Sequence, residues 1–522
     1  MAKPTSVKLG AAELEDALKY LLAVGESDFF PAPFELSALD HSWDKVRPVL
    51  ESVELLSYRP RRAVTMIGPK SHFTIRPIQL LDPVDAVLYT ALAFRLAAAI
   101  QRKRDQYQAG IVYSYHFDAS RSGQPRVLQS DWDGYRDAVR EKAGRAGAVA
   151  TADIADFFPR LYLHRLENAL SHLGGDEPAS RALMRLVEEW AHGTSQGIPV
   201  GLRASNVLAE ALLIEVDEYL LSLEIDFVRY LDDFTIFGKA DTDCQAALFE
   251  LGARLLHSQS LSLNSDKTRI FTSRGFIDWR LEPHSKEQEV RDQIIDSVFD
   301  GDIYKDIEYA ELDDETRQAV DEVDARQWLE TALAGEIVDL KTVKFVLNFL
   351  SALRRPDLVG PVIENLDRLL PASEALGRFF SVLDEIDSED RAKVGGQLLA
   401  YINNAAFVPD FQAMWLLEPF TRSPAWNQLS SIRQVARNHR DPMVRRQAFL
   451  AIGQSRDRGA ILDARLAFEA AGEWEARAIL YACRSLPRDE RDKFYSDAGP
   501  GGDWTIQNVL LRAVIEYAKS IG

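Results

Sequence analysis

The chain has 522 residues, 46% of them hydrophobic, which is more than one compact core accommodates, so we expect at least two domains. Its formal net charge of −19 argues against broad binding of nucleic acid, because that affinity comes mainly from Lys and Arg at the phosphates. Residues 1–285 carry 32 basic and 39 acidic residues, and residues 286–522 carry 29 and 41, so any basic channel must be local.

The first strong element lies between residues 76 and 105. Apolar residues recur there at helical spacing, and the stretch ends in a basic cluster, Arg102 to Arg104, which suits the C-terminus of a helix. We therefore expect a long helix that begins near Pro83.

An apolar, branched stretch follows from Val149 to Phe158 and ends at Pro159. This pattern predicts a buried strand that runs into a turn. Asp153 lies inside that strand, where a lone charge is costly. An acid in such a place indicates a binding or catalytic role.

The next segments complete a compact pattern. Residues 204–223 have helical periodicity, and IDFVRYLDDFTIFG (225–238) consists of two apolar strands on either side of Asp232 and Asp233. We expect a hairpin that presents both carboxylates at its bend. With helical spacing over 245–263 and short apolar runs over 268–280, the order becomes β–α–β–β–α–β, the split βαβ arrangement.

The composition changes near residue 285, because residues 286–330 contain 16 acidic and 5 basic residues and little strand pattern. Further on, DPMVRRQAFLAI (441–452) and GEWEARAILYAC (472–483) align at Arg445 and Arg477, 32 residues apart. This form resembles HEAT-type helical repeats, with an irregular helical bundle as the alternative. We predict an acidic all-α domain over 286–522.

Cysteine usage and the absence of long apolar runs bear on location. Cys244 and Cys483 can form neither a disulfide framework nor a four-ligand zinc site, which favours a reducing cytoplasm. The chain offers no run of roughly 18 uncharged apolar residues, so we expect no membrane span. The N-terminus also lacks the apolar core of a secretion signal.

Asp153, Asp232 and Asp233 are the candidate catalytic and metal-binding residues. Two Mg²⁺ ions about 4 Å apart can activate a 3′-hydroxyl and stabilise a leaving pyrophosphate, and they need oxygen ligands from at least two carboxylates. Mn²⁺ would serve the same ligands. An acidic pair alone is weak evidence in a chain with 80 acidic residues.

The pair gains weight from its neighbours, because YLDD (230–233) and four further segments resemble the reverse-transcriptase motifs in order and spacing. ADIADFFPRLYLHRL (152–166) is similar to the first palm motif. The resemblance implies that Asp153 binds metal and that Phe158 is the aromatic gate that selects deoxynucleotides.

Three other segments extend the resemblance. SQGIPVGLRASNVLAE (195–210) resembles the motif that lines the nucleotide pocket, which implies nucleotide-binding roles for Gln196 and Gly197. SLNSDKTRIF (262–271) resembles the motif whose lysine lies near the pyrophosphate, which makes Lys267 a catalytic candidate. GFIDW (275–279) loosely resembles the hairpin that grips the primer.

Upstream, the segments around residues 70–78 and 112–117 resemble the fingers, whose basic residues bind the incoming triphosphate. This implies nucleotide-binding roles for Lys70 and Arg76. Relatives commonly carry an arginine where this chain has His116, and a neutral imidazole would hold phosphate less firmly.

The resemblance implies an α+β right-hand polymerase. Its N-terminal helices and fingers would occupy 1–150 and its palm 151–285, with 40–285 as the polymerase-like unit, followed by the helical domain. A reverse-transcriptase palm before acidic helical repeats is most similar to the prokaryotic defence-associated, abortive-infection reverse transcriptases. That likeness implies antiphage defence, dNTP substrates, a single-stranded DNA product, protein priming without a template, homo-oligomers, and a phage or host protein trigger.

Three alternatives remain open at this point. The enzyme could be a conventional reverse transcriptase that copies an RNA template. It could be an RNA polymerase, although a bulky residue at Phe158 disfavours that reading. The palm could also be an inactive scaffold or sensor that works through its helical repeats, but such a relic would be expected to lose its costly buried acids first.

Overall fold

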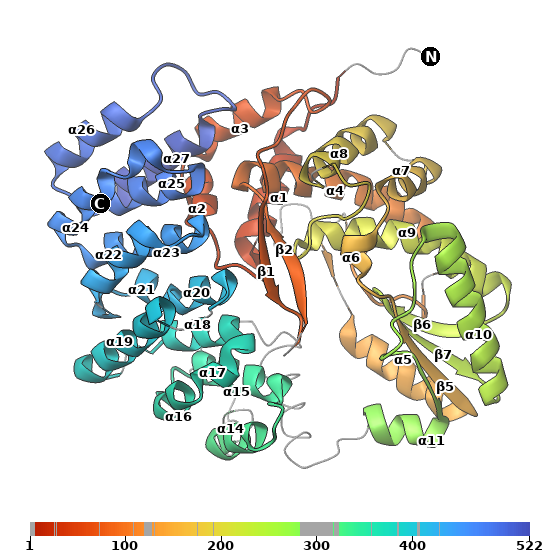
Figure 1. The fold of residues 1–522 in the computed structure, drawn as a ribbon. Coiled ribbons are helices and arrows are strands. Elements are labelled where there is room, and N and C mark those ends of the chain that lie inside the picture. The colour runs from red at the N-terminus through yellow and green to blue at the C-terminus, as the bar shows by residue number, and fades with distance from the viewer. Residues whose placement is uncertain are drawn as a thin grey trace. The chain divides into compact units, whose positions relative to one another are not determined.

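The computed structural model describes residues 6–522, apart from 26, 28, 72–73, 108, 119–127, 130, 175, 192, 282–316, 318–322, 357, 384–385, 405–407 and 427. The chain divides into two compact units (Figure 1). The first unit comprises residues 1–28, 43–65 and 78–285, and the second comprises 29–42, 66–77 and 286–522. The second unit thus includes two N-terminal segments in addition to the predicted helical domain.

The first unit is mostly helical and contains antiparallel strands. Its helices are α1 (Ala11–Val24), α3 (Trp43–Ser52), α4 (Pro83–Arg104), α5 (Trp132–Arg145), α6 (Phe157–Arg160), α7 (Leu163–His172), α8 (Glu177–Trp190), α9 (Arg203–Ser222), α10 (Asp241–Arg254) and α11 (Ser273–Phe276). Its strands are β3 (His116–Phe117), β4 (Leu128–Gln129), β5 (Ala148–Asp153), β6 (Asp226–Tyr230), β7 (Asp233–Gly238) and β8 (Arg269–Thr272). The hairpin of β1 (Val64–Pro69) and β2 (Ile75–Leu80) is divided between the two units.

The central sheet has the strand order β6-β7-β5-β8, and all of its pairs are antiparallel. With α9 before β6 and α10 before β8, the chain follows the predicted β–α–β–β–α–β order. All six residues of β5 are buried, which explains why this strand is a continuous apolar run rather than an alternating one.

The sheet is covered on both faces. Tyr135 and Val139 of α5 form a buried cluster with Val149 of β5 and Phe237 of β7. Helix α10 packs against β5, β7 and β8, and the backbone at Ala150 contacts its Cys244. A Cβ at Gly238 of β7 would lie 3.0 Å from Cys244 Sγ, and side chains alternate along a strand, so α10 lies on the face opposite to Phe237 and α5.

Helix α4 begins at Pro83, as predicted. The Asp82 side chain accepts a hydrogen bond from the Val84 N–H, and Pro83 occupies the first turn, where a missing N–H costs nothing. The helix packs against α1, α8 and α9. By length and composition it could cross a membrane, but 89% of its most apolar window is buried within the protein, as in a core helix.

Two short segments differ from the prediction. Phe157 and Phe158 lie in helix α6 rather than at the end of the strand, which stops at Asp153. Residues 273–281 are helical rather than a hairpin, with Thr272 capping α11. The helical turn buries Phe276 completely in the cluster beneath the sheet.

Apart from its share of the β1–β2 hairpin, the described part of the second unit consists of helices and the segments that connect them. They are α2 (Phe34–His41), α14 (Ala325–Ala334), α15 (Leu340–Ala352), α16 (Val359–Glu364), α17 (Leu366–Leu369), α18 (Ser373–Ser381), α19 (Ser388–Asn404), α20 (Asp410–Leu416), α21 (Glu418–Arg422), α22 (Leu429–Asn438), α23 (Pro442–Ser455), α24 (Arg458–Arg465), α25 (Glu473–Ala482), α26 (Arg488–Ala498) and α27 (Val509–Ile521).

Polar contacts in this unit repeat at nearly constant spacing along the chain. Pairs separated by 30 to 32 residues are Asp410–Arg440, Arg422–Gln454, Arg433–Asp463, Arg445–Glu475, Gln454–Arg484 and Arg458–Glu490. These separations are close to the 32 residues between Arg445 and Arg477 in the two similar segments of the sequence.

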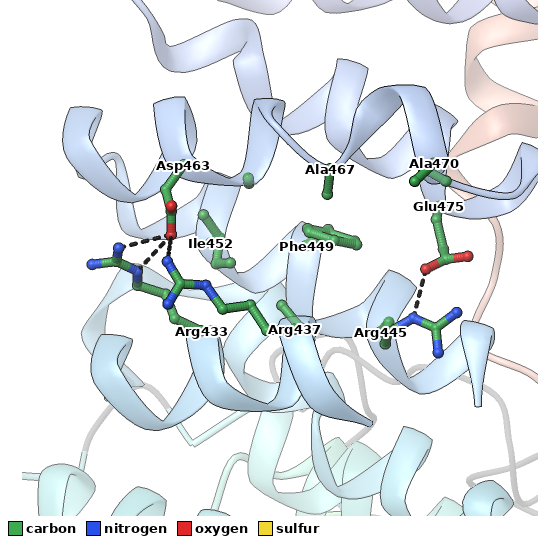
Figure 2. A pocket seen from close by; sticks show the side chains of 12 residues that line it. Arg433, Arg437, Arg445, Phe449, Ile452, Asp463, Ala467, Ala470 and Glu475 are labelled. Atoms are coloured by element: carbon green, nitrogen blue, oxygen red, sulfur yellow. Dashed lines mark hydrogen bonds and ion pairs between the residues drawn. The ribbon is translucent and has the colours of Figure 1, made fainter. Parts of the chain in front are cut away.

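A cleft of about 260 Å³ lies among α22, α23, α24 and α25 (Figure 2). At one end Arg433 and Arg437 both contact Asp463, and at the other Arg445 contacts Glu475. Each carboxylate on its wall therefore already has an arginine partner.

Helix α2 belongs to the second unit although it is far from it in sequence. Glu35 is fully buried and forms ion pairs with Arg446 (2.7 Å) and Arg477 (3.3 Å). The Phe34 ring stacks on Tyr481, with centroids 4.1 Å apart. Residues 29–42 therefore contribute to the core of the helical unit.

Candidate active site

The site lies where strand β5 ends beside the first residue of strand β7. Asp153, the last residue of β5, is the register partner of Asp233, the first residue of β7. Alternation places Asp153 on the same face as Val149, and Asp233 on the same face as Phe237. Two like charges directly opposite each other on neighbouring strands are destabilising, so this pair requires a cation or a shared proton.

Asp232 completes a group of three acids. It lies in the two-residue loop between β6 and β7, and its carbonyl accepts a hydrogen bond from the Ile154 N–H. Burial, followed by the charges of Asp233 and Asp153, raises the pKa of Asp232 to about 7. Burial and the Asp153 charge also raise the pKa of Asp233. The structure thus brings together the three predicted aspartates.

Lys267 supplies positive charge to this group. Its Nζ lies 2.8 Å from Asp153 Oδ1, and Asn264 Nδ2 lies 3.2 Å from Asp153 Oδ2. Burial opposes the charged ammonium, but the hydrogen bond to Asp153 and the three aspartate charges raise the pKa of Lys267. The ammonium is therefore protonated at neutral pH. The sequence identified Lys267 and missed Asn264, which comes three residues earlier.

The donor set can be tested for its fit to divalent metal ions. Three carboxylates, of which Asp232 and Asp233 have raised pKa values, beside a single lysine form a site short of positive charge, and carboxylate oxygens are the ligands that Mg²⁺ prefers. Among the residues that the structure describes, no three His, Cys, Asp or Glu side chains already converge as in a formed metal centre. Asp153 instead faces Lys267. The chemistry of the donors fits a metal site that reorganises on binding.

The segment after Asp153 meets the glycine-containing turn that precedes α9. The Phe158 carbonyl accepts a hydrogen bond from the Ile198 N–H (3.2 Å), and the Leu161 carbonyl accepts one from the Gly197 N–H (2.9 Å). Gln196 forms a β-bridge with Tyr162. The structure therefore joins Phe158, Gln196 and Gly197, which the sequence assigned to one pocket. The Phe158 side chain is half-buried.

Gly197 has a backbone reason to be glycine. Its φ of +93° lies in the left-handed region, and a Cβ there would lie 3.4 Å from the Pro159 carbonyl oxygen. The close approach of the two segments thus depends on this residue.

Lys70 and Arg76 belong to the second unit, whereas the three aspartates belong to the first. The Arg76 guanidinium lies over the Phe29 ring, 4.3 Å from its centroid. Their triphosphate-binding roles remain predictions.

His116 begins β3 and is half-buried. Burial, and then the charge of Arg104, lower its pKa, so the imidazole is neutral at pH 7. Its weaker hold on phosphate than that of an arginine stays a prediction.

The sequence interpretation also missed a buried polar network beside the YLDD loop, which contains Glu210, Asp217 and Arg229. A signal for it exists, because Glu210 and Asp217 are acids seven residues apart, on one face of a helix and next to apolar residues. Arg229 likewise interrupts an apolar strand. Charged residues in fully buried elements indicate mutual pairing.

Residues 69–298 match the family model described as reverse transcriptase (RNA-dependent DNA polymerase). This part of the chain is therefore similar to reverse transcriptase domains, and the match includes β5 to β8 and the three aspartates.

Individual similarities are more distant. The retron Mx65 reverse transcriptase of Myxococcus xanthus is 29% identical over 139 residues, which cover 23% of this chain and 32% of that protein. The similarity thus spans about a third of the relative's length.

Two solved telomerase structures also align with the chain. The apo telomerase of Candida tropicalis has a TM-score of 0.35 and 9% identity over 69% of each chain. The telomerase of Candida albicans bound to a fragment of telomeric RNA has a TM-score of 0.31 and 13% identity over 70% of this chain and 64% of that one.

Proposed function

We propose that the chain is a reverse-transcriptase-type DNA polymerase that adds dNTPs to a growing strand. The observation that carries the proposal is the register pairing of Asp153 with Asp233, beside Asp232 and Lys267, within a reverse transcriptase domain. Maintaining three such carboxylates in one place is costly unless a ligand uses them.

The proposed roles follow from the chemistry of each group. Enzymes with this domain generally use divalent metal ions such as Mg²⁺, which Asp153, Asp232 and Asp233 would hold. Two bound ions would polarise the triphosphate and lower the pKa of the primer hydroxyl. Lys267, kept protonated by its acidic surroundings, offers positive charge or a proton to the departing pyrophosphate.

The remaining proposed roles concern the nucleotide. Phe158 would exclude the ribose 2′-hydroxyl, and the turn at Gln196 and Gly197 would support the pocket. Lys70 and Arg76 would bind the triphosphate, since guanidinium and ammonium groups are the usual phosphate ligands.

Incubation of the purified protein with dNTPs and Mg²⁺ tests the activity directly. We expect labelled DNA from the wild type and none from Asp232→Ala or Asp233→Ala, both of which should remain folded by circular dichroism. If wild type and variants are equally inactive under all template and primer conditions, the chain is better explained as a polymerase-like scaffold or sensor.

We further propose synthesis of single-stranded DNA without a copied template, primed from the protein itself. The chain's net charge of −19 supports this, because a long duplex would need a broad cationic surface. Product that migrates with the protein until protease treatment is the expected result. Product that forms only with an annealed RNA template would instead establish conventional reverse transcription.

We place this activity in antiphage defence of the abortive-infection type, as the resemblance to defence-associated reverse transcriptases implies. A phage or host protein would act as the trigger. Cells that express the wild type should resist phages that overcome cells with the Asp232→Ala variant. Equal plaque counts over a broad phage panel would contradict this role.

We assign residues 40–285 to the polymerase-like unit and residues 286–522 to a HEAT-like repeat domain, although residues 29–42 and 66–77 lie in the second compact unit. Contacts repeated every 30 to 32 residues along α20 to α26 support stacked helix pairs. Such domains offer extended surfaces for partners, including further copies of the chain. Light scattering of the purified protein will show whether it forms the homo-oligomer that we expect.

A further inference from the structure

The loop that carries Asp232 has an unusual backbone. Tyr230 and Asp233 are register partners, so Leu231 and Asp232 form a two-residue hairpin loop. Leu231 has a φ of +54°. Such loops require a positive φ at one or both central residues, and Gly or Asn usually occupy these positions. A leucine there is strained, and strain persists only where the surroundings hold it.

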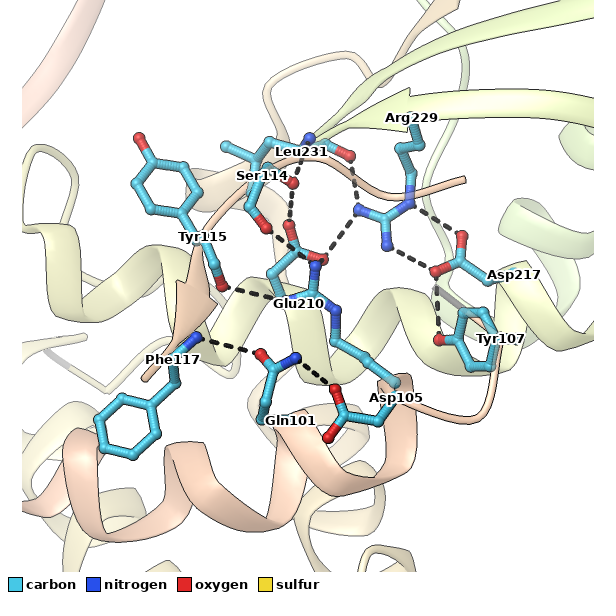
Figure 3. A network of polar contacts seen from close by, with 11 residues as sticks. Gln101, Asp105, Tyr107, Ser114, Tyr115, Phe117, Glu210, Asp217, Arg229 and Leu231 are labelled. Atoms are coloured by element: carbon cyan, nitrogen blue, oxygen red, sulfur yellow. Dashed lines mark hydrogen bonds and ion pairs between the residues drawn. The ribbon is translucent and has the colours of Figure 1, made fainter. Parts of the chain in front are cut away.

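Leu231 is held by two side chains, that of Ser114 from outside the hairpin and that of Arg229 from strand β6 (Figure 3). Its N–H donates to Ser114 Oγ (2.8 Å), and its carbonyl accepts from Arg229 Nη1 (2.9 Å). These two hydrogen bonds thus engage both backbone polar groups of the strained Leu231.

The side chains that hold Leu231, those of Ser114 and Arg229, are part of one buried network. Arg229 also donates to Glu210 (2.9 Å) and to Asp217 (2.8 Å) of α9. Arg104, at the end of α4, donates to the carbonyls of Ser114 (2.8 Å) and Tyr115 (3.1 Å). In this network two arginines, Arg104 and Arg229, balance the charges of the two acids, Glu210 and Asp217.

The direction of the hydrogen bonds follows from the charge of Glu210. Burial opposes its ionisation, but the charges of Arg104 and Arg229 hold the pKa of Glu210 below its usual value. An ionised carboxylate can only accept, so the Ser114 hydroxyl donates its single proton to Glu210. A lone pair of the Ser114 oxygen then remains for the Leu231 N–H.

The segment that contains Ser114 is also hydrogen-bonded to β6 through its backbone. The Arg229 N–H donates to the Ile111 carbonyl (2.7 Å), and the Tyr113 N–H donates to the Arg229 carbonyl (3.1 Å). Ser114 therefore lies on a backbone that is fixed relative to the hairpin, and its hydroxyl is a rigid support for Leu231.

We propose that Ser114, together with Glu210 and Arg229, is a positioning residue for the carboxylates: it holds Leu231 in its strained conformation and so aims Asp232 and Asp233 for metal binding. This inference rests on the proposed polymerase function for its catalytic consequence. The buried network would thus have a role in the site in addition to its contribution to stability.

Ser114→Ala is the variant that tests the proposal. It removes the acceptor for Leu231 but leaves all four charged residues in place. One such hydrogen bond corresponds to roughly a three- to tenfold effect. We expect the Mg²⁺ concentration for half-maximal synthesis to rise by about that factor, while the KM for dNTP changes less than about twofold. Hydrogen exchange of the peptide that contains Leu231 should become faster.

Ser205→Ala is the matched control, because Ser205 is equally buried and bonds to Tyr89 (2.9 Å) away from the hairpin. It should cost similar stability and leave the metal requirement unchanged. If Ser114→Ala and Ser205→Ala alter the metal requirement and the exchange of the Leu231 peptide equally, Ser114 has only a structural role and the proposal falls.

A double-mutant cycle with Leu231→Gly tests the path of the effect. Glycine adopts the positive φ without strain, so Ser114→Ala should have a much smaller effect in that background. An undiminished effect would show that Ser114 does not act through Leu231. Arg229 variants are avoided, because loss of a buried cation between two acids threatens folding itself.

The binding of Mn²⁺ alone, measured by calorimetry, distinguishes this proposal from the proposed function. Weaker Mn²⁺ binding by Ser114→Ala supports the positioning role even if no polymerase activity is found. A polymerase whose Mn²⁺ affinity and metal requirement are unaffected by Ser114→Ala would retain the function and overturn this inference.

Discussion

At the residue scale, cations compete for the three carboxylates of the site. Lys267 partly neutralises Asp153, whereas Asp232 and Asp233 retain raised pKa values because burial and the neighbouring acids outweigh the charge of Lys267. A divalent ion that binds these carboxylates must therefore displace protons and compete with the Lys267 ammonium.

This competition predicts that metal affinity depends on pH. Asp232 has a pKa of about 7 in the folded, metal-free chain, against an ordinary value of 3.8. Below pH 7 a metal ion must displace its proton, so affinity for Mn²⁺ should fall by up to about tenfold per pH unit there and level off above. Calorimetric titrations at pH 6, 7 and 8 measure this.

The same shift has a consequence for the stability of the metal-free chain. A raised carboxyl pKa means that the folded state binds the proton more tightly than the unfolded state does. The contribution of Asp232 is therefore complete below pH 3.8 and is lost as the pH rises through 7. Asp232→Asn should flatten both pH profiles, and unchanged profiles in that variant would contradict the assignment.

Phe158→Ala predicts a change in substrate choice. Its backbone carbonyl, which holds Ile198, is retained, so the turn should stay in place. Loss of the ring should raise incorporation of ribonucleotides relative to dNTPs by roughly tenfold or more, because a steric barrier to the 2′-hydroxyl is removed. Primer-extension assays with both substrates provide the measurement.

The neighbouring Phe157 offers the control for this substitution. It is 2% exposed and packs in the core, so Phe157→Leu should lower stability without changing the discrimination between sugars. Equal discrimination in wild type and Phe158→Ala would remove Phe158 from the proposed gate.

At the element scale, the turn that contains Gly197 joins α6 to the segment before α9. Gly197→Ala introduces a side chain at a φ of +93° and should destabilise the protein by about 1 kcal/mol or more. Because the strain falls on the segment that holds Phe158, activity should drop by at least about tenfold. Thermal melting and dNTP incorporation measure the two effects separately.

Gly193→Ala is the comparison for Gly197→Ala. Gly193 also has a positive φ, +78°, but no atom lies within 4 Å of its hypothetical Cβ. It should cost similar stability and preserve activity. Equal activity loss in both variants would indicate that backbone strain alone, rather than the contact with the Phe158 segment, lowers the rate.

Elements that depend on local pattern could be predicted from the sequence. Helix α4, the β6–β7 hairpin and the strand that ends at Asp153 all follow from apolar periodicity and capping within a few residues. The helical form of residues 273–281 could not be predicted in this way, because it is decided by burial of Phe276 beneath the sheet. The contact of Ser114 with Leu231 spans 117 residues and leaves no local trace.

At the scale of the whole molecule, the units do not follow the order of the chain. Residues 29–42 and 66–77 belong to the helical unit although polymerase-like segments surround them in sequence. The contact that explains the first of these is Glu35 with Arg477, which are 442 residues apart. Charge and periodicity near Glu35 give no indication of that partner.

Glu35 therefore provides a test of how the helical unit is composed. Glu35→Ala would leave Arg446 and Arg477 buried without their shared carboxylate, which costs about 3–5 kcal/mol. The loss should appear as faster hydrogen exchange in α23 and α25, which carry the two arginines. Glu35→Gln keeps an acceptor and should lose less.

The contrast is Glu13→Ala in the first unit, which removes the partly exposed ion pair with Arg95 and should cost less than about 1 kcal/mol. Exchange in α23 and α25 should not change in that variant. If Glu35→Ala also leaves these helices fully protected, residues 29–42 are not part of the helical core. If it exposes them, the second unit requires a segment from the N-terminus, and a fragment that begins at residue 286 should be markedly less stable than the same helices within the full chain.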